Sequence, residues 1–371
     1  MYDILVAAIF TFVVGSAILS CYFRLKYALI IMGVKTAIPS IYFAFTGTIW
    51  TPYDGIQFQQ TASELISQGY NPIIVLLDLN FLIGYLNTTH IQPHWWTMLS
   101  QYLFGNHYFS PIFLNVLLTI LIGMYTMFIL SRTGFSSEYY KYFFVFFNIH
   151  WDVLAWSSFV NIKGVFITLV AVFFLYHLIM LVSSTENNRK YYHLLLLGGA
   201  LSVMYLSRYY MIAILLASAI TWLSIEYSSK DKIKYMIPTI TFFGLFSRYG
   251  LQRVRGTRYL EGISILSFVE SLPRILLTPR PWGVLPEFSF LIIPSIFHWI
   301  FFIPASMCGI WLGYRHRNLR LIFIYAIMFF IFYSLFPDLA SARMRVQVVF
   351  VFTIIQYQFL EFILKRFEIK Y

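Results

Sequence analysis

The feature that most constrains this chain is a series of apolar segments with few charged residues, separated by short polar connections. A helix of roughly 20 apolar residues is long enough to cross the hydrocarbon core of a membrane. The segments that we expect to span are residues 4–23, 27–46, 109–130, 139–158, 163–183, 233–248, 288–312, 319–336 and 346–364.

Composition supports the same class. The 371 residues are 60% hydrophobic and 11% charged, whereas a soluble domain carries roughly a quarter charged residues. We therefore expect an all-α polytopic membrane protein with a single transmembrane domain over residues 1–371. The number of crossings is about ten to twelve, counted at one span per membrane-length segment. It stays open because residues 73–104 and 191–225 can each be divided in two ways.

The basic residues indicate how the chain is oriented. Clusters at residues 24–26, 230–234, 315–320 and 365–366 are expected on the cytoplasmic side, where Lys and Arg accumulate. The net charge of +11 is explained by these loops and by anionic lipid, so it does not indicate a nucleic-acid partner. Residues 47–92, 249–287 and 337–345 then form outer loops, which together make the expected active-site face.

The stretch from Thr51 to Pro72 is polar although apolar segments flank it. It predicts a short amphipathic helix over residues 56–67 that lies on a membrane surface, with Asp54 in a tight turn just before it. Asp54 has two readings. Its carboxylate can cap the helix by accepting from the amides of Ile56 and Gln57, or it can act as a catalytic base.

Two outer loops carry arginines, and positive charge is unusual on that side. Arg274 and Arg280 lie in the first, close to Trp282, and Arg343 and Arg345 lie in the second. Arginine binds phosphate oxygens in a bidentate manner, so these four side chains are candidate phosphate ligands. The alternatives are anchoring to lipid headgroups for the first pair and an ion pair at a helix start for the second.

Other polar residues are less informative. Lys35, inside an expected span, is read as a lysine that extends to the membrane surface, with a polar cavity as the alternative. His90 and His94 are four residues apart, but Pro93 lies between them and no acid accompanies them, so no metal site is expected there. The chain also contains no Gly-rich nucleotide loop.

The first outer loop resembles that of the GT-C membrane glycosyltransferases. The matching residues are Asp54, Phe58, Ala62, Gly69 and Pro72, followed by Gln92, Pro93, His94 and Trp95, and then by Phe104, Gly105, Phe113, Leu114 and Asn115. The likeness covers residues 45–135. Further on, the segment from Pro279 to Trp282 and the pair Arg343 and Arg345 are similar to bacterial polysaccharide-assembly members. Many members have Asp-Glu where this chain has Asp54-Gly55.

This resemblance implies an enzyme of surface polysaccharide biosynthesis in the bacterial inner (plasma) membrane, with its active site on the outer face. The donor would be a sugar or oligosaccharide linked to polyprenyl (pyro)phosphate, and the acceptor a glycan or a lipid-linked glycan. A repeat-unit polymerase is one form of this activity. Asp54 would be catalytic, Arg274, Arg280, Arg343 and Arg345 would bind the donor phosphate, and His94, Trp95 and Trp282 would contact acceptor or sugar.

Two alternatives stay open at this point. A lipid-linked sugar flippase or transporter would use the same arginines without a base. No metal ligand is assigned, but a divalent cation, Mg²⁺ or Mn²⁺, could bridge Asp54 and the phosphate.

Overall fold

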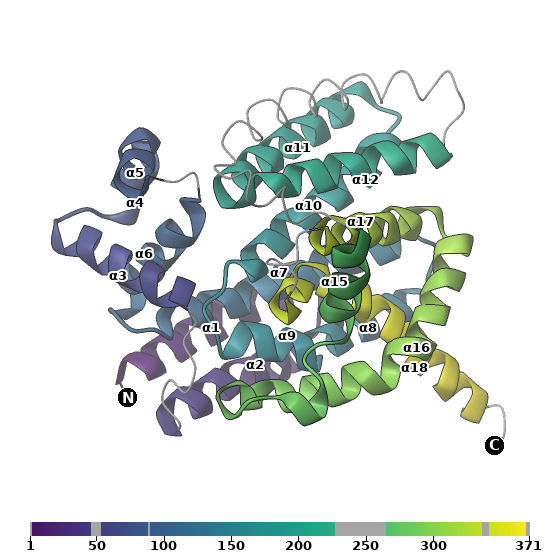
Figure 1. Ribbon diagram of the computed structural model, residues 1–371, viewed down its shortest axis with the longest axis horizontal. Coiled ribbons are helices and arrows are strands. Elements are labelled where there is room, and N and C mark those ends of the chain that lie inside the picture. The colour runs from purple at the N-terminus through teal and green to yellow at the C-terminus, as the bar shows by residue number, and fades with distance from the viewer. Residues whose placement is uncertain (1, 46–52, 88–89, 227–264, 336–340, 369–371) are drawn as a thin grey trace.

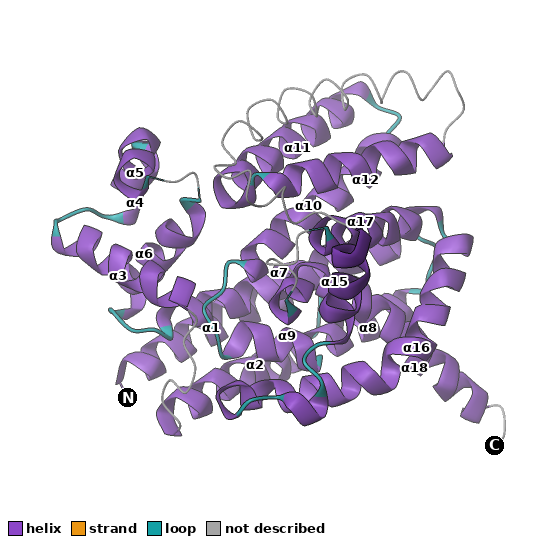
Figure 2. Ribbon diagram, viewed as in Figure 1, coloured by secondary structure: helices purple, strands orange, loops and turns teal. Residues whose placement is uncertain are grey.

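The structure is a computed structural model in which every described element is a helix (Figures 1 and 2). It describes the chain except residues 1, 46–52, 88–89, 227–264, 336–340 and 369–371. The expected span at 233–248 and the arginines at 248, 253, 255 and 258 lie outside the described residues.

Seven described helical stretches are long and apolar enough to cross a membrane, which confirms an all-α polytopic membrane protein. They include α1 (Tyr2–Ser20), α2 (Leu25–Phe45), α7 (Ser110–Ser131), α10 (Gly164–Ser183), α16 (Ile292–Arg315), α17 (Arg317–Ser334) and α18 (Val349–Glu368). The larger number of ten to twelve crossings stays a prediction.

Two expected segments are divided in the structure. The segment 139–158 breaks into α8 (Ser137–Ile149) and α9 (Trp151–Ser158). The break occurs because His150 is extended and its ring Nδ1 accepts from the amide of Asp152 at 3.2 Å, which caps α9. The ambiguous segment 191–225 forms two helices, α11 (Asn187–Arg208) and α12 (Tyr210–Glu226), which meet at Tyr209.

The first outer loop differs from its prediction in two ways. Helix α3 (Tyr53–Ser67) begins before Asp54, so this residue lies in its first turn. The apolar stripe of α3, including Phe58, Ala62 and Leu65, is buried instead of facing lipid, because α3 packs on α6 (Gln92–Phe104). In the sequence, α4 (Pro72–Leu77) and α5 (Leu79–Leu86) lie between these two helices. Helices α3 to α6 form a group at the left of Figure 1.

Lys35 does not extend to a surface. It is fully buried in α2, and its Nζ donates to the backbone oxygen of Asn148 at 3.4 Å, next to the break between α8 and α9. The carbonyl oxygens at the end of α8 lack partners within their own helix, so this break offers a polar group inside the bundle. The expectation of a surface-reaching lysine was wrong.

The long helices give the bundle two distinct ends. Before α7, His107 lies 2.7 Å from Asp3, and after α7 comes Arg132. Helix α17 runs the opposite way, from Arg317 to a C-terminal turn where Tyr333 accepts a hydrogen bond from Arg208. We call these the Asp54 end and the Arg317 end, for the residues of the two cavities described below.

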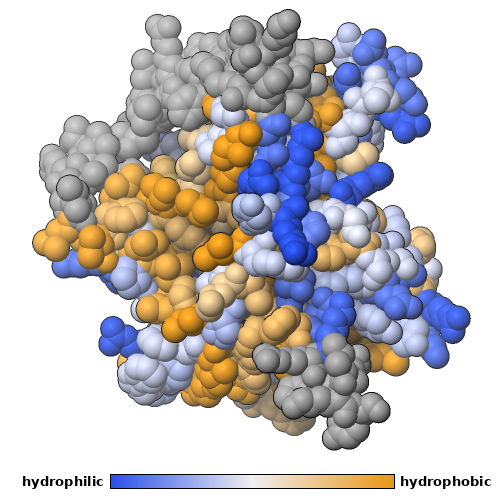
Figure 3. Space-filling view, turned by 90° about the vertical axis from the view of Figure 1, so that its right-hand side faces the viewer, coloured by the Kyte–Doolittle hydropathy of each residue, from blue (hydrophilic) through white to orange (hydrophobic). Residues whose placement is uncertain are grey.

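Several arginines gather at the Arg317 end. The residues at the Arg317 end include Arg132, Arg315, Arg317 and Arg320. Arg24 lies at this end too, because the nearby ring of Tyr22 packs on Phe128, close to the C-terminal end of α7. Figure 3 views the right-hand side of Figure 1, where α16 ends and α17 begins, and shows hydrophilic residues along the middle of this face with an apolar area to their left.

The remaining described elements connect the C-terminal spans at the Asp54 end. They are α15 (Ile265–Leu277) and three 3-10 turns, η1 (Pro281–Gly283), η2 (Pro286–Leu291) and η4 (Ala342–Val348). Helix α15 packs on α17 and on η4. Thus η4, which leads into α18, is held between α15 on one side and α10 on the other.

Candidate functional site

A small polar cavity at the Asp54 end gathers residues from four distant parts of the chain. Asp54 comes from α3, Lys163 precedes α10, Arg208 ends α11, and Arg343 belongs to η4. The remaining lining residues are Phe58, Ile162, Gly164, Met344 and Gln347. Among the described residues that line it, one carboxylate therefore faces three basic side chains. We call it the Asp54 pocket.

Asp54 is positioned by a close backbone contact beside it. A Cβ atom on Gly55 would lie 3.0 Å from the backbone oxygen of Asn161 and 3.3 Å from the ring and hydroxyl of Tyr108. That hydroxyl in turn accepts from the Asn161 amide at 3.1 Å. The first turn of α3 therefore rests directly on the segment that leads to Lys163, and a side chain at position 55 would require its neighbours to move by a few tenths of an ångström.

Arg343 is positioned by the contact of η4 with the start of α10. Thr168 donates from its hydroxyl to the backbone oxygen of Val346 at 2.9 Å. A Cβ atom on Gly164 would lie only 2.4 Å from Cγ1 of Val346. This packing brings Arg343 within reach of α3, although 289 positions separate the two residues in the sequence (343 minus 54).

Arg343 and Asp54 form an ion pair across the pocket. The Arg343 Nη1 and the Asp54 Oδ2 are 3.3 Å apart, and the two side chains are 38% and 40% exposed. Both groups can therefore be reached from outside. A cavity of about 20 Å³ remains beside the pair, which is room for about one water molecule. A larger ligand must separate the two side chains to enter.

Lys163 is half-buried behind this ion pair. Its pKa is lowered from 10.5 to about 7, mainly by burial and then by the nearby Arg208 and Arg343, against an opposing effect of Asp54. The protonated form of Lys163 is therefore disfavoured by desolvation. An anionic ligand would offset this cost and keep Lys163 protonated.

Arg208 contributes a charge that is fixed in place. It is 6% exposed, its Nη1 donates to the Tyr333 hydroxyl at 2.8 Å, and its guanidinium lies 5.3 Å from the ring centre of Tyr210. Tyrosines neutralise none of its charge. The pocket therefore contains a permanent guanidinium, a lysine that titrates near neutrality and an arginine paired with the carboxylate.

The residues present do not suit a divalent cation. Among the residues that the structure describes, no group of three His, Cys, Asp or Glu side chains could hold a metal ion. Asp54 is the single acid of the pocket lining and has basic neighbours, which would repel Mg²⁺ or Mn²⁺. We therefore assign no step to a metal.

The sequence-predicted site residues divide into two sets. Asp54 and Arg343 come together in the pocket. Arg345 is buried behind it and donates to the backbone oxygen of Leu276 at 3.0 Å. Arg274 and Arg280 are exposed and do not line the pocket.

The three candidate sugar contacts also lie outside the pocket lining. His94 is buried with its ring edge on Phe58, and burial lowers its pKa to about 4, so it is neutral at pH 7. Trp95 donates from its ring nitrogen to the backbone oxygen of Pro72 at 2.9 Å, which is a packing role. Trp282 is 73% exposed and leans on Trp299.

Comparisons with protein families, with curated proteins and with solved structures found no match to this chain.

Sequence reasoning did not select three of the pocket's polar residues as ligands. Lys163 begins an expected span at residues 163–183, and Arg208 lies within the ambiguous segment 191–225. A lysine that begins a span at the end opposite the basic loops was the available signal, since positive charge is depleted there. Gln347, whose Oε1 has no hydrogen-bond partner among the described residues, carried no signal in the sequence.

Proposed function

We propose that this protein is a membrane glycosyltransferase that takes a sugar or oligosaccharide from a polyprenyl-(pyro)phosphate donor, with the Asp54 pocket as its active site. The observation that carries the proposal is the gathering of one accessible carboxylate with three basic side chains at one end of a membrane bundle. A base and an anion-binding set are what this transfer needs from a protein.

The orientation of the bundle supports this role. The arginines of the Arg317 end fit a cytoplasmic face under the positive-inside rule, and this supports an outer face for the Asp54 pocket. A polyprenyl-linked donor presents its headgroup at the membrane surface, so its phosphate can reach Arg343 while its chain stays in lipid. The resemblance of residues 45–135 to GT-C enzymes points the same way.

The chemistry follows from the positions of the charges. A phosphate oxygen of the donor draws Arg343 away from Asp54, and Lys163 and Arg208 bind the same group from the buried side. The freed carboxylate of Asp54 accepts the proton of the acceptor hydroxyl as its oxygen attacks the anomeric carbon. The bond from that carbon to the phosphate oxygen breaks, and the lipid (pyro)phosphate leaves with both electrons, stabilised by the basic groups.

This single displacement predicts inversion at the anomeric carbon, because the hydroxyl attacks opposite the leaving phosphate. Gln347 lies in the pocket, and its amide oxygen has no hydrogen-bond partner in the part of the chain that the structure describes. We assign it a hydrogen bond to a sugar hydroxyl, which would relieve the cost of leaving a buried polar atom without a partner. The acceptor on this proposal is a glycan or a lipid-linked glycan of the cell surface.

The test is a glycan profile of cells that carry Asp54→Asn, compared with wild type and a deletion at matched membrane levels. We expect the surface glycan to be lost while the lipid-linked intermediate accumulates at the outer face. The matched control is Asp78→Asn, because Asp78 is an exposed helix cap near α3 and asparagine caps equally well. It should keep the wild-type profile.

Two outcomes of this test would count against the proposal. A wild-type glycan in the Asp54→Asn strain would remove the base from the mechanism. Intermediate retained on the cytoplasmic side, in the deletion and in the Arg343→Gln strain, would favour a lipid-linked sugar flippase, which needs the arginines but no base.

A further inference from the structure

We propose that the Arg317 end holds a second binding site, which takes a phosphate-bearing ligand at the membrane face opposite the Asp54 pocket. The inference does not depend on the proposed glycosyl transfer. It rests on a cavity of about 340 Å³ lined by Arg132, Thr133, Ser183, Trp222, Arg315, His316, Arg317 and Asn318. We call this cavity the Arg317 pocket.

The size of the Arg317 pocket suits a ligand. Its volume falls within the roughly 300–1,000 Å³ of small-molecule sites, whereas the Asp54 pocket holds about one water molecule. The two pockets lie at opposite ends of the same helix. Gly164 at the start of α10 lines the Asp54 pocket, and Ser183 at its end lines the Arg317 pocket. They are therefore separated by about the length of a membrane-spanning helix, ~30 Å.

The walls of the Arg317 pocket are fixed by polar contacts between helices. Asn318 donates from its amide to the backbone oxygen of Arg132 at 2.8 Å, and His316 lies 3.1 Å from the backbone oxygen of Thr133. Trp222 donates to the backbone oxygen of Arg317 at 3.1 Å. These contacts hold the ends of α7 and α12 and the start of α17 together.

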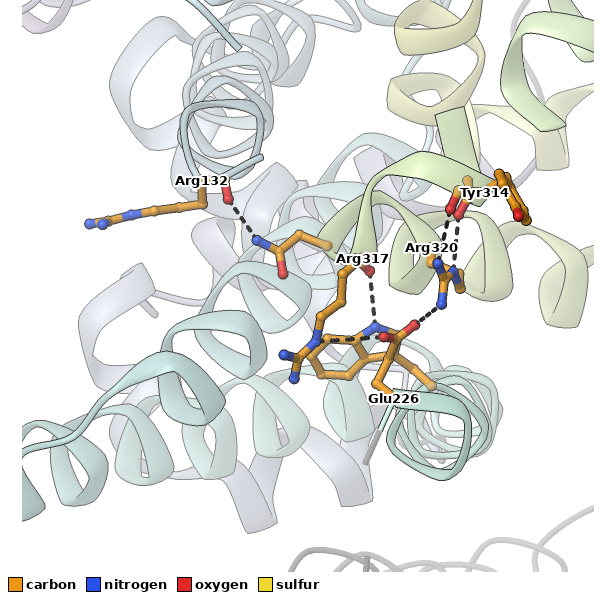
Figure 4. A network of polar contacts seen from close by, with 8 residues as sticks. Arg132, Glu226, Tyr314, Arg317 and Arg320 are labelled. Carbon is orange, nitrogen blue, oxygen red and sulfur yellow. Dashed lines mark hydrogen bonds and ion pairs between the residues drawn. The ribbon is translucent and has the colours of Figure 1, made fainter. Parts of the chain in front are cut away.

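Positive charge exceeds negative charge here. No Asp or Glu is among the lining residues that the structure describes. The nearby Glu226 is held by Arg320, with Arg317 3.7 Å away, as Figure 4 shows. In the described part of the chain, Arg132 and Arg315 form no ion pair.

A helix terminus adds to the attraction for an anion. Helix α17 begins at Arg317 in the pocket wall, and its N-cap residue His316 makes no side-chain capping bond. The dipole of its first turn therefore favours a negative group. Arg132, Arg315 and Arg317 line the same cavity as this terminus, and arginine can bind phosphate oxygens in bidentate fashion.

The test measures stabilisation of the purified protein by inorganic pyrophosphate, in a background of Lys163→Met and Arg343→Gln, which removes two of the three basic groups of the Asp54 pocket. We expect pyrophosphate to raise the apparent melting temperature in this background. Adding Arg132→Gln and Arg315→Gln should abolish the rise, since each lost charge-assisted contact weakens binding by about tenfold. Neither side chain supports another element through a hydrogen bond, so the fold should persist.

A matched control and a second arm identify the source of the phosphate. Arg189→Gln removes an exposed arginine from the neighbouring start of α11, where it pairs with Glu186, and should leave the rise unchanged. The second arm compares nanodiscs of phosphatidylcholine with and without phosphatidic acid. A higher melting temperature with pyrophosphate identifies a soluble ligand, and a higher melting temperature with phosphatidic acid alone identifies a lipid headgroup. In either case the Arg132→Gln, Arg315→Gln substitution must abolish the increase. A rise that survives the double substitution, or no rise in either arm, overturns the proposal.

Discussion

Arg343 and Asp54 close the pocket at the Asp54 end with an ion pair of 3.3 Å. Because both side chains are more than a third exposed, water screens the pair, and its contribution to stability is at most about 1 kcal/mol. The pair is thus weak enough for a ligand phosphate to replace it. On the proposed function, this pairing keeps the Asp54 carboxylate neutralised until an anionic ligand binds.

The first prediction concerns Arg343. Arg343→Gln should change the apparent stability by less than about 1 kcal/mol, because only a screened ion pair is lost. Transfer should fall by about 10- to 100-fold, since a charge-assisted bond to the leaving phosphate is removed. Glycan yield and melting temperature measured on the same preparation test both parts. Arg280→Gln, an exposed arginine outside the pocket lining, is the control and should leave both unchanged.

The second prediction concerns the packing of η4 on α10. In Gly164→Ala, a methyl group would lie 2.4 Å from Cγ1 of Val346, so η4 must move, at a cost of about 1–3 kcal/mol. We expect a lower melting temperature and loss of glycan. Gly198→Ala in α11 is the control, because nothing lies within 4 Å of its Cβ position. Equal stability of the two variants would show that this contact does not hold Arg343.

The third prediction concerns the pH dependence of stability. The pKa of Lys163 is about 7 in the folded protein, against an ordinary value of 10.5. Between these values the unfolded chain binds more protons than the folded one, so this group makes stability rise with pH across the window. Lys163→Met should flatten that rise, as measured by melting temperature from pH 6.5 to 9.5. An unchanged slope would contradict the burial of Lys163 as an ionisable group.

The fourth prediction concerns ligand binding at Lys163. Deprotonation above pH 7 removes a positive charge from the empty pocket, so phosphate affinity should fall by up to about tenfold per pH unit. Lys163→Arg keeps its charge throughout this range and should give a flatter affinity profile. Titrations at pH 7 and 8.5 measure the difference. A profile that stays equally steep in Lys163→Arg would show that another group controls binding.

Sequence patterns predicted the class of the fold because membrane spans depend on local composition. The bounds of α7 and α10 agree with the expected segments within two residues, since each is one uninterrupted apolar run. The break at His150 was not predicted, because it depends on a ring nitrogen that caps α9 and on a partner, Gln356, more than 200 residues away. The burial of Lys35 depends on that same break.

The candidate site was predicted in part for a similar reason. Asp54 and Arg343 are unusual in their own loops, so each was noticed locally, and the meeting of the two depends on how η4 packs on α10. Arg345 has the same local signal as Arg343, yet it points to the backbone of Leu276 instead of the pocket. Spacing within one loop cannot distinguish these two side chains, because their directions depend on the packing of α15, whose Leu276 accepts the hydrogen bond from Arg345.

The most direct test of the central claim is the affinity of purified Asp54→Asn for farnesyl pyrophosphate, a short isoprenoid pyrophosphate. It should be measured in the Arg132→Gln, Arg315→Gln background, so that the Arg317 pocket does not contribute. If Asp54 is a base and Arg343 a phosphate ligand, the substitution frees Arg343, and binding should be equal to wild type or tighter although transfer is lost. Weaker binding in Asp54→Asn would contradict these roles, because the carboxylate would then be helping to hold the phosphate.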